Sequence, residues 1–474
     1  MKMYISGEWI DKTEKIQVSD PFDNSHIDTV PKADKDDMLN AVESAKRGFE
    51  AMKRVPVYER SAILYKTAQY VKDHHEDFSQ TIAREASKTI NEARGEVSRT
   101  INTLTWSAEE AKRINGETLP FDSFPNGVNK KGFYYRFPIG IILAITPFND
   151  PLNLVAHKLG PAFAGGNAVI LKPASVTPLS GIKLAQAFLE SGLPKEAIQV
   201  VTAPGKDAGD VLVPHADIRM VSFTGGVEAG KEVTKKAGIK KIGMELGSNS
   251  PVIVWKDAEI DKAVDSCVEG GFWAAGQNCI GVQRLYIHKD IYEEFKKKFV
   301  DKTKTYKIGN KLDESTDMGP LITQKEAERV EFAIFDAINK GAVCLTGGKR
   351  EGALLEPTVL ENVPEDTIQH NEEAFGPVVN LYQVEDIDEA IAKSNSLPYG
   401  LHAAIFTNNI NLAMKAAYEL DCGGVMINDS TDYRLDSMPF GGVKNSGLGR
   451  EGISFALHEM TEPKVVCFNL PYQL

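Results

Sequence analysis

The chain contains few cysteines, and their positions exclude two common uses of this residue. Five occur in 474 residues, with no Cys-x-x-Cys pair and no Cys/His spacing typical of zinc ligands. An odd number of scattered thiols also argues against a disulfide framework and favours a reducing compartment. We therefore expect a cytoplasmic protein without a metal centre. The five are Cys267, Cys279, Cys344, Cys422 and Cys467.

Long hydrophobic runs are also missing. The longest, IGIILAI at 139–145, is followed by Thr146 and Pro147 and is far too short to span a bilayer. It predicts a buried strand instead. The first residues, MKMYISGEWIDK, lack the apolar stretch of an export signal. The sequence therefore predicts no association with a membrane.

Basic residues are outnumbered by acidic ones. The chain has 54 Lys and Arg against 66 Asp and Glu, a formal net charge of -12. Nucleic acids and anionic membrane surfaces need a basic face, so both are disfavoured as partners. Aromatic residues make up only 8% of the chain, which weakly disfavours a long aliphatic or benzylic substrate. One arginine in a pocket can still bind a small anion, and we expect a small-molecule substrate.

Apolar periodicity divides the chain into helical and α/β regions. Residues 36–115 repeat apolar positions every three or four residues, which predicts helices. From 139 to 256, short apolar strands alternate with helical segments and end with KIGMEL and PVIVW. A second alternating set runs from about 258 to 445. Such alternation is typical of parallel sheets covered by helices, so we predict an α/β fold with a doubly wound, Rossmann-like unit and a second α/β unit.

Two β-rich segments lie apart from both sets. They are FYYRFP near residue 133 and KVVCFNL near residue 464. We interpret them as strands of a small arm that pairs between subunits. With 474 residues the chain is long enough for two or three domains.

Two segments at predicted strand ends are suited to a phosphorylated ligand. In FTGGVEAG, Thr224, Gly225 and Gly226 form a strand-to-helix turn whose backbone can approach a phosphate. A plain tight turn is the alternative. In LKPASVTP, Lys172 can bond a ribose hydroxyl or a phosphate, whereas a surface lysine is the simpler interpretation.

Three further side chains could carry chemistry. Glu245, in MELGSNSP, has apolar neighbours that would raise its pKa toward that of a general base. Asn149, in ITPFNDP, is a neutral donor for a developing oxyanion. Cys279, in GFWAAGQNCIGVQR, has small neighbours that leave a thiol accessible. The alternatives are a structural carboxylate, a turn asparagine and an inert buried thiol.

Together these segments resemble the aldehyde dehydrogenase superfamily. ITPFNDPL, KPASVTP, FTGG, MELGSNSP, GQNC, EEAFGPV and MPFGGVKNSGLGREG occur in the order and at about the spacing of that family. The resemblance covers nearly the whole chain. The interval from Glu245 to Cys279, 279 − 245 = 34 residues, also suits the family's general base and nucleophile.

The resemblance implies a covalent mechanism. Cys279 would attack the aldehyde carbon, and the Asn149 amide and the Cys279 backbone N–H would hold the oxyanion. Hydride transfer to a nicotinamide would leave a thioester, which water activated by Glu245 would hydrolyse. Alternatives of another class are acyl transfer to coenzyme A and a non-catalytic structural homologue, and the presence of Glu245 favours hydrolysis.

The resemblance also implies NADP or NAD as cofactor. Many members that prefer NAD have a glutamate where this chain has Ser175, so a 2′-phosphate should be tolerated, although Lys206 nearby could tilt the preference either way. The chain also departs from the family at Phe148, usually Trp, and at Asp150, usually aromatic. The implied cofactor contacts are Thr146, Pro147, Phe148, Lys172, Ser175, Gly205, Phe223, Thr224, Gly225, Gly226, Leu246, Gly247, Glu373 and Phe375.

The family's organisation implies domain limits and assembly. We expect an NAD(P)-binding domain at 1–122 and 139–245 and a catalytic domain at 246–445. An oligomerisation arm is expected at 123–138 and 455–474, in a homo-oligomer that is a dimer or a tetramer.

The loop INDSTDYRLDSMPFGG, 427–442, borders the substrate entrance in the family. Arg434 there could bind an anionic tail, unless it pairs with Asp432 or Asp436 within the loop. Arg99 and Arg284 are further candidates. The segment is similar to that of members acting on lactaldehyde, glyceraldehyde 3-phosphate, phosphonoacetaldehyde and sulfolactaldehyde. We expect a small anionic or hydroxylated aldehyde, with succinate semialdehyde or a broad specificity as the alternative.

Overall fold

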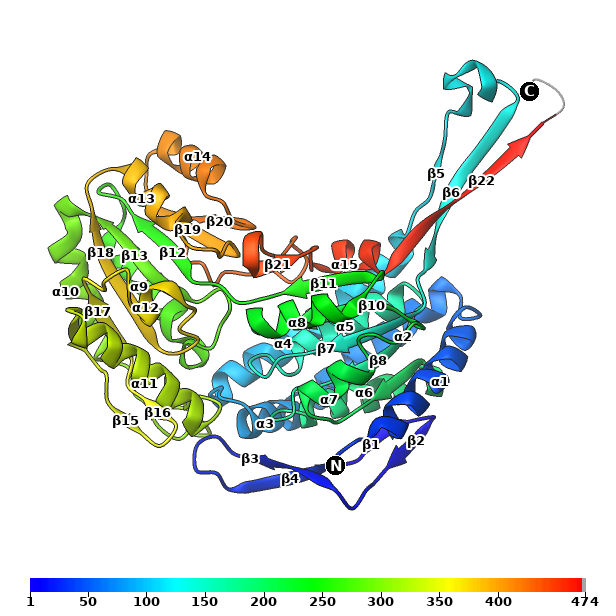
Figure 1. Cartoon of the computed structure of the whole chain (residues 1–474), viewed down its shortest axis with the longest axis horizontal. Helices are drawn as coiled ribbons and strands as arrows, with labels where there is room; N and C mark the ends of the chain where they lie inside the picture. The colour runs from blue at the N-terminus through cyan, green and yellow to red at the C-terminus, as the bar shows by residue number, and fades with distance from the viewer. Residues whose placement is uncertain (471–474) are drawn as a thin grey trace.

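Two separate sheets and a projecting arm organise the chain in the computed structural model, which describes residues 1–470 (Figure 1). Residues 471–474, which we expected in the arm, lie outside the described residues. The first sheet has the strand order β2-β1-β9-β8-β7-β10-β11-β21, and the second has the order β14-β17-β18-β13-β12-β19-β20. The predicted α/β, doubly wound class is confirmed.

Five parallel strands form the centre of the first sheet. In β7, Ile142 and Ala144 pack into the core on one face of the sheet, while Ile141 and Leu143 pack into the core on the other. Both faces are apolar because helices cover both. The strands are β7 (Ile141–Ile145), β8 (Ala168–Lys172), β9 (Ile198–Val200), β10 (Ile218–Thr224) and β11 (Lys241–Glu245), with β1 (Met3–Ile5), β2 (Glu8–Ile10) and β21 (Gly447–Leu448) at the edges.

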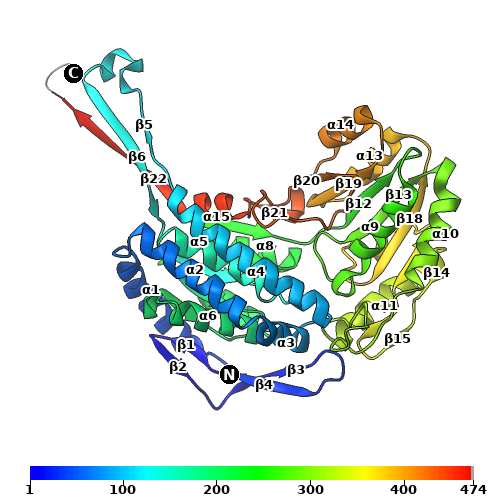
Figure 2. The ribbon, with the colours of Figure 1, turned by 180° about the vertical axis from the view of Figure 1, so that it is seen from behind.

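In the helical region near the N-terminus, the first helix packs directly on this sheet, and the other three pack on two of the later helices that cover it (Figure 2). The helices of this region are α1 (Lys35–Met52), α2 (Val57–Asp73), α3 (His75–Glu85) and α4 (Ile90–Glu110). Later helices alternate with the strands, as predicted. These are α5 (Asn153–Ala164), α6 (Leu179–Glu190), α7 (Gly205–Val211) and α8 (Val227–Ala237).

The second sheet is parallel except for the antiparallel pair of β14 and β17. We expected PVIVW to end the first alternating set, but it forms β12 in the middle of the second sheet, because the chain crosses between the sheets at 246–249. The strands are β12 (Ser250–Val254), β13 (Val282–His288), β14 (Val343–Thr346), β17 (Thr358–Glu361), β18 (Val378–Val384), β19 (His402–Phe406) and β20 (Gly424–Ile427). The helices are α9 (Ile260–Phe272), α10 (Tyr292–Thr303), α11 (Gln324–Asn339), α12 (Ile368–Asn371), α13 (Ile387–Asn395) and α14 (Ile410–Glu419).

The arm is a three-stranded antiparallel sheet that projects from the first unit (Figure 1). It consists of β22 (Thr461–Asn469), β6 (Lys130–Pro138) and β5 (Glu117–Thr118). Two of the expected limits differ from this arrangement. β5 lies within the segment assigned to the first domain, and residues 455–459 belong to α15 (Ile453–Glu459), which packs on α5.

Within residues 1–470, no helix combines the length and the apolar composition needed to cross a membrane. Two small hairpins complete the described elements: β3 (Lys15–Ser19) with β4 (His26–Pro31), and β15 (Arg350–Glu351) with β16 (Leu354–Leu355).

Candidate active site

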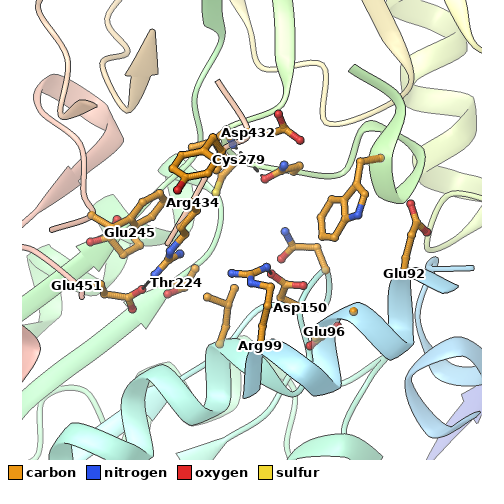
Figure 3. A pocket seen from close by; sticks show the side chains of 18 of the residues that line it. Glu92, Glu96, Arg99, Asp150, Thr224, Glu245, Cys279, Asp432, Arg434 and Glu451 are labelled. Carbon is orange, nitrogen blue, oxygen red and sulfur yellow. Dashed lines mark hydrogen bonds and ion pairs between the residues drawn. The ribbon is translucent and has the colours of Figure 1, made fainter. Parts of the chain in front are cut away.

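A cavity of about 580 Å³ brings the three predicted chemical groups together. Cys279, Glu245 and Asn149 all line it, although they come from three distant parts of the chain. Figure 3 shows Cys279 and Glu245 in this cavity. The other lining residues are Asn91, Glu92, Gly95, Glu96, Arg99, Asp150, Leu154, Thr224, Glu269, Trp273, Asn278, Ile280, Asp432, Tyr433, Arg434, Phe440 and Glu451.

A strained turn after α9 presents the cysteine. Ala274, Ala275 and Gly276 have φ values of 50°, 56° and 70°, all in the left-handed region. This conformation costs about 1–2 kcal/mol for each alanine. At Gly276 an added Cβ would lie 2.1 Å from the Gly376 carbonyl oxygen, so only glycine fits there. The turn is held by its surroundings rather than by its own preference.

Two donors suited to an oxyanion face the cavity. Among residues 1–470, neither the Asn149 amide nor the Cys279 backbone N–H makes a hydrogen bond within the protein. Asn149 is only 8% exposed, so its amide has little water to bind. Free donors beside the thiol are what a developing oxyanion needs.

Burial controls the ionisation of the thiol. It raises the pKa of Cys279 to about 12, although the Arg434 charge opposes this, so the resting thiol is protonated. Nucleophilic attack therefore needs a proton acceptor.

Glu245 ends β11 and is buried, with Oε2 lacking a hydrogen-bond partner. Burial, followed by the negative charge of Glu451, raises the pKa of Glu245 well above its ordinary value. Arg434 and Lys158 oppose the rise. A carboxyl group with a raised pKa is a stronger base once ionised, which suits proton abstraction from water.

The expected cofactor residues gather at one edge of the first sheet. Thr146, Lys172, Thr224 and Glu245 end or follow parallel neighbours β7, β8, β10 and β11, whose carboxyl ends meet there. Ligands bind at this edge in open α/β sheets. Burial lowers the pKa of Lys172 to about 8, and within the described chain its ammonium has no ion-pair partner.

The glycine turn at this edge is open. Gly226 precedes α8, and a Cβ added there or at Gly205 would meet nothing within 4 Å. The Gly225 N–H donates to the Glu245 carbonyl (3.1 Å), which ties the turn to β11. Ser175 Oγ donates to the Ala203 carbonyl oxygen (3.0 Å).

Four of the expected cofactor contacts lie against one another in pairs, Gly247 with Glu373 and Phe148 with Phe375. Glu373 Oε1 accepts from Ser248 N–H (2.8 Å), and a Cβ at Gly247 would lie 2.1 Å from Glu373 Oε2. Burial raises the pKa of Glu373 to about 7. Phe375, with φ 41°, places its ring edge-on to Phe148, with 5.7 Å between centroids.

The remaining expected cofactor contacts differ in which of their groups a ligand could reach. Thr146 Oγ1 is buried without a partner, and Pro147 is half-buried beside it. Phe223 and Leu246 pack in the hydrophobic core beneath the glycine turn, so only their backbones are available to a ligand.

Arg434 lies in the cavity wall and pairs with an unexpected partner. Its Nη2 lies 3.2 Å from Glu451 Oε2, and its guanidinium stacks 3.7 Å from the centre of the Phe440 ring. The alternative of an intraloop pair with Asp432 or Asp436 is therefore wrong. The Arg434 side chain is only 7% exposed, and its Nε has no partner.

Arg99 approaches the same cavity from α4. Its Nη2 donates to Asp436 Oδ1 (3.0 Å), and its Nη1 lies 3.5 Å from Asp150 Oδ2. Asp150 also contacts the buried Lys88, whose Nζ donates to Glu96 Oε2 (2.7 Å). The two arginines thus converge on one cavity, each beside carboxylates that fix its position.

Arg284 does not line the cavity, and its expected contact with substrate is wrong. Its guanidinium is buried behind the site and donates to the backbone carbonyl oxygens of Asn249, Lys393 and Ser394. These bonds use its donors to tie β13 to the last turn of α13 and to the segment before β12.

Sequence reasoning missed the charged network beneath the cavity. Glu92 and Glu96 lie at helical spacing from Arg99, which was already a candidate, and this spacing could have revealed them. Lys88 and Glu451 carried no such signal, because their partners do not lie one helical turn away. Lys88 pairs with Glu96 and Asp150, 8 and 62 residues away, and Glu451 pairs with Arg434, 17 residues away.

Comparison with known proteins places this chain in a family. The model of the Aldehyde dehydrogenase family matches residues 9–466.

The chain belongs to the aldehyde dehydrogenase family.

Three relatives illustrate how close the aldehyde dehydrogenases come to this chain. Aspartate-semialdehyde dehydrogenase 1 of Pseudomonas canavaninivorans is 49% identical over 455 residues, 96% of this chain and 97% of that protein. The 3-sulfolactaldehyde dehydrogenase of Priestia aryabhattai is 46% identical over 469 residues, 99% of this chain and 98% of that protein. The structure of glyceraldehyde-3-phosphate dehydrogenase GapN from Methanocaldococcus jannaschii, complexed with NADP, has a TM-score of 0.93 at 41% identity and covers 97% of this chain and 100% of that chain.

The resemblance noted in the sequence is thereby confirmed, and the protein is an aldehyde dehydrogenase. The NADP in the GapN structure agrees with the expected cofactor class for this aldehyde dehydrogenase.

Proposed function

We propose that this protein oxidises a small aldehyde with an anionic tail to the carboxylic acid, with NADP or NAD as cofactor. The observation that carries the proposal is one cavity holding Cys279, Asn149 and Glu245 together with the guanidinium groups of Arg99 and Arg434. Candidate substrates are sulfolactaldehyde, glyceraldehyde 3-phosphate, phosphonoacetaldehyde and lactaldehyde. The names of the sulfolactaldehyde and glyceraldehyde-3-phosphate relatives support this class.

The edge of the first sheet fits a dinucleotide. Lys172 is a buried cation without an ion-pair partner among residues 1–470, and Gly226 leaves the N-terminus of α8 uncovered. Glu373, held by Ser248 N–H, could accept hydrogen bonds from a ribose. Ser175 places no carboxylate beside Lys172, which is compatible with a 2′-phosphate as well as a hydroxyl.

The protein's own residues account for capture of the aldehyde. The Cys279 thiol loses its proton to solvent, and its sulfur bonds to the aldehyde carbon while the C=O electron pair moves to the oxygen, which gives a thiohemiacetal. This covalent capture fixes the carbon in the cavity. The Asn149 amide and the Cys279 N–H donate to the oxyanion, where charge develops. The nicotinamide, when bound, supplies the hydride acceptor.

Release of the acid depends on Glu245. Glu245 lines the cavity, and its Oε2 is buried without a hydrogen-bond partner, so the carboxylate can accept a proton from a water that attacks the thioester. The presence of this base supports hydrolysis over transfer to coenzyme A. An assay with added coenzyme A should yield no acyl thioester.

The anionic tail is assigned to the two arginines. Burial of Arg434 strengthens its attraction for an anion by removing competing water. Glu451 and Phe440 hold its guanidinium group in place. Arg99 lies across the same cavity and offers a second guanidinium (Figure 3). Two guanidinium groups are suited to bind a phosphate, a sulfonate or a carboxylate.

Negatively charged side chains in the same cavity favour a second substrate class, one that carries an ammonium group. Asp432 and Glu269 line the cavity, and neither forms an ion pair with any residue of the described chain. Burial raises the pKa of Asp432 to about 6, and a nearby ammonium would oppose that rise. A substrate with both a carboxylate and an ammonium, such as aspartate semialdehyde, would use both ends. The name of one relative points the same way.

An aldehyde panel tests both classes. We would compare kcat/KM for aldehydes of similar size carrying a phosphate or sulfonate, a carboxylate, a carboxylate with an ammonium, or a hydroxyl only, with each cofactor. The wild type should prefer an anionic tail, and Arg434→Ala should lose about 100-fold or more on that tail beyond whatever it loses on the neutral aldehyde, since a truncated charge pair loses several kcal/mol. Equal losses on charged and neutral aldehydes would remove the tail assignment.

We also propose that the arm mediates assembly of a homo-oligomer, a dimer or a tetramer. β22 lies at the edge of the arm sheet, and Tyr135, Val465 and Phe468 are exposed on the arm. An unpaired strand with apolar side chains is suited to pairing with another copy. Light scattering on the intact protein should give a multiple of 52.0 kDa.

We also propose that the protein is located in the cytoplasm.

A further inference from the structure

Glu92 of α4 contacts the turn that presents the nucleophile. Its Oε1 accepts a hydrogen bond from Ala274 N–H at 2.7 Å, across 182 residues of sequence. Its Oε2 accepts from Thr89 N–H at 2.7 Å, and its own N–H donates to Thr89 Oγ1 at 3.3 Å, which completes a capping box at the start of α4. One carboxylate thus caps a helix and binds the catalytic turn.

The turn depends on this contact. Ala274 is 1% exposed, so its N–H has no access to water, and Glu92 is the acceptor that it finds. The Ala274 carbonyl is held from the other side by Gln277 Nε2 at 3.0 Å. Without the carboxylate, a buried N–H would lose its acceptor in a segment that already holds two alanines in the left-handed region. Relaxation of that segment would move Cys279, five residues beyond Ala274.

The same helix carries a proposed substrate contact. Glu92, Gly95, Glu96 and Arg99 all line the cavity, at the spacing of one helix face. α4 is continuous between Glu92 and Arg99. The same helix therefore fixes the position of the substrate tail on Arg99 and the position of the turn that carries the nucleophile. Tail binding by Arg99 rests on the proposed function, whereas the contact of Glu92 with the turn does not.

We propose that Glu92 is a positioning residue for the reaction: it holds the Ala274–Gly276 turn so that the Cys279 sulfur meets the aldehyde carbon beside the Asn149 amide. Glu92 touches no reacting atom in this role. A carboxylate suits the position because its two oxygens serve two backbone N–H groups at once, which an amide side chain cannot do.

The test compares Glu92→Ala and Glu92→Gln with Thr89→Val. Thr89→Val removes the hydroxyl of the capping box and leaves the carboxylate free to bind Ala274, so it reports the loss of the helix cap alone. Glu92→Gln keeps one carbonyl acceptor for Ala274 N–H. Each variant would be assayed as intact protein for kcat, KM, cofactor affinity, melting temperature and the rate of Cys279 alkylation by iodoacetamide, followed by mass spectrometry.

We expect Glu92→Ala to lower kcat by up to about 100-fold, because displacement of a reacting atom by about 1 Å has that cost. KM for the aldehyde and affinity for the cofactor should change much less, and the alkylation rate should change with kcat. Glu92→Gln should recover part of kcat, and Thr89→Val should stay within about twofold of wild type despite a lower melting temperature.

A kcat in Glu92→Ala no lower than in Thr89→Val, with unchanged alkylation, would overturn the proposal. If Glu92→Ala does not fold, equal kcat in Glu92→Gln and wild type, with equal alkylation rates, would overturn it as well. Cys279→Ser separates this failure from that of the proposed function. Turnover in Cys279→Ser contradicts the mechanism itself, whereas an inactive Cys279→Ser beside normal Glu92 variants contradicts only the positioning role.

Discussion

Arg434 and Glu451 form a buried ion pair in the wall of the catalytic cavity, with Nη2 3.2 Å from Oε2. The pair links the proposed substrate site to the proposed base, because the Glu451 charge raises the pKa of Glu245 while the Arg434 charge lowers it. Lys158 donates to the other oxygen of Glu451 at 3.0 Å. Burial raises the pKa of Glu451, but Lys158 and Arg434 more than offset this and hold it below its ordinary value, so Glu451 is charged.

Glu451→Gln should therefore alter both stability and the pH profile. Removing the charge leaves Arg434 and Lys158 buried without their partner, which should lower the free energy of unfolding by about 3–5 kcal/mol. It also removes a negative neighbour that raises the pKa of Glu245, so the acidic limb of the kcat profile should move to lower pH. Denaturant titration and a pH series of kcat would measure the two effects.

The matched control is Glu419→Gln on α14. Glu419 pairs with Lys415 at 2.7 Å on the exposed surface, with 46% of its side chain accessible. Loss of such a pair should change stability by less than about 1 kcal/mol and leave the pH profile unchanged. An acidic limb that stays in place in Glu451→Gln would contradict the coupling.

The buried thiol gives a second prediction. Because burial raises the pKa of Cys279 to about 12, alkylation of the free enzyme should accelerate about tenfold for each pH unit from about pH 7 to about pH 10. Iodoacetamide labelling followed by mass spectrometry would give the rate at this residue. Cys279→Ser provides the background from the other thiols. A rate that levels off near pH 8 would mean an ionised thiol at rest.

Glu245→Gln should separate acylation from hydrolysis. The amide keeps the shape of the side chain but cannot accept a proton, so the acyl-enzyme should accumulate and steady-state turnover should fall by about 100- to 10,000-fold. Intact-protein mass spectrometry would show the acyl adduct, and a burst of reduced cofactor would match its amount. Full turnover by this variant would contradict the assignment of the base.

Much of the candidate site could be predicted from local sequence patterns, because the carboxyl ends of neighbouring parallel strands meet at one edge of the sheet. Thr146, Lys172, Thr224 and Glu245 could be placed together from strand ends alone, since each terminates or follows an apolar run. The strand alternation also identified the second sheet. In both cases the signal lies within a few residues of the position concerned.

The errors involve contacts between segments distant in sequence. Arg284 was a weaker candidate for a substrate contact, but its carbonyl partners Asn249, Lys393 and Ser394 lie 35, 109 and 110 residues away. Arg434 was weighed against its neighbours Asp432 and Asp436, whereas the loop folds back onto Glu451. The limits of the arm were misplaced because β5 has only two residues, too few to show alternation.

Gly95 offers a test of access to the cavity. It lies inside α4, where glycine destabilises a helix, yet a Cβ added there would meet nothing within 4 Å. Gly95→Ala should therefore raise the free energy of unfolding by about 0.5–1 kcal/mol and leave activity nearly unchanged. Gly95→Leu would project into the cavity one helical turn from Arg99, so it should raise KM for aldehydes with a bulky anionic tail more than for short neutral ones. Equal effects on both aldehydes would mean that residue 95 does not limit the space that the cavity offers to the substrate tail.

Ser175 occupies the position that should decide the preference between NAD and NADP. Its hydroxyl donates to the Ala203 carbonyl at 3.0 Å, and it lies three residues beyond Lys172, the proposed contact of the adenosine ribose. Ser175→Glu would place a carboxylate beside that ribose, where it repels a 2′-phosphate and accepts from ribose hydroxyls. The ratio of kcat/KM for NAD to that for NADP should rise by at least about tenfold, or about 1.4 kcal/mol. Ser175→Gln, similar in size but neutral, is the control and should shift the ratio far less. If both substitutions change the ratio equally, size rather than charge decides the preference at this position.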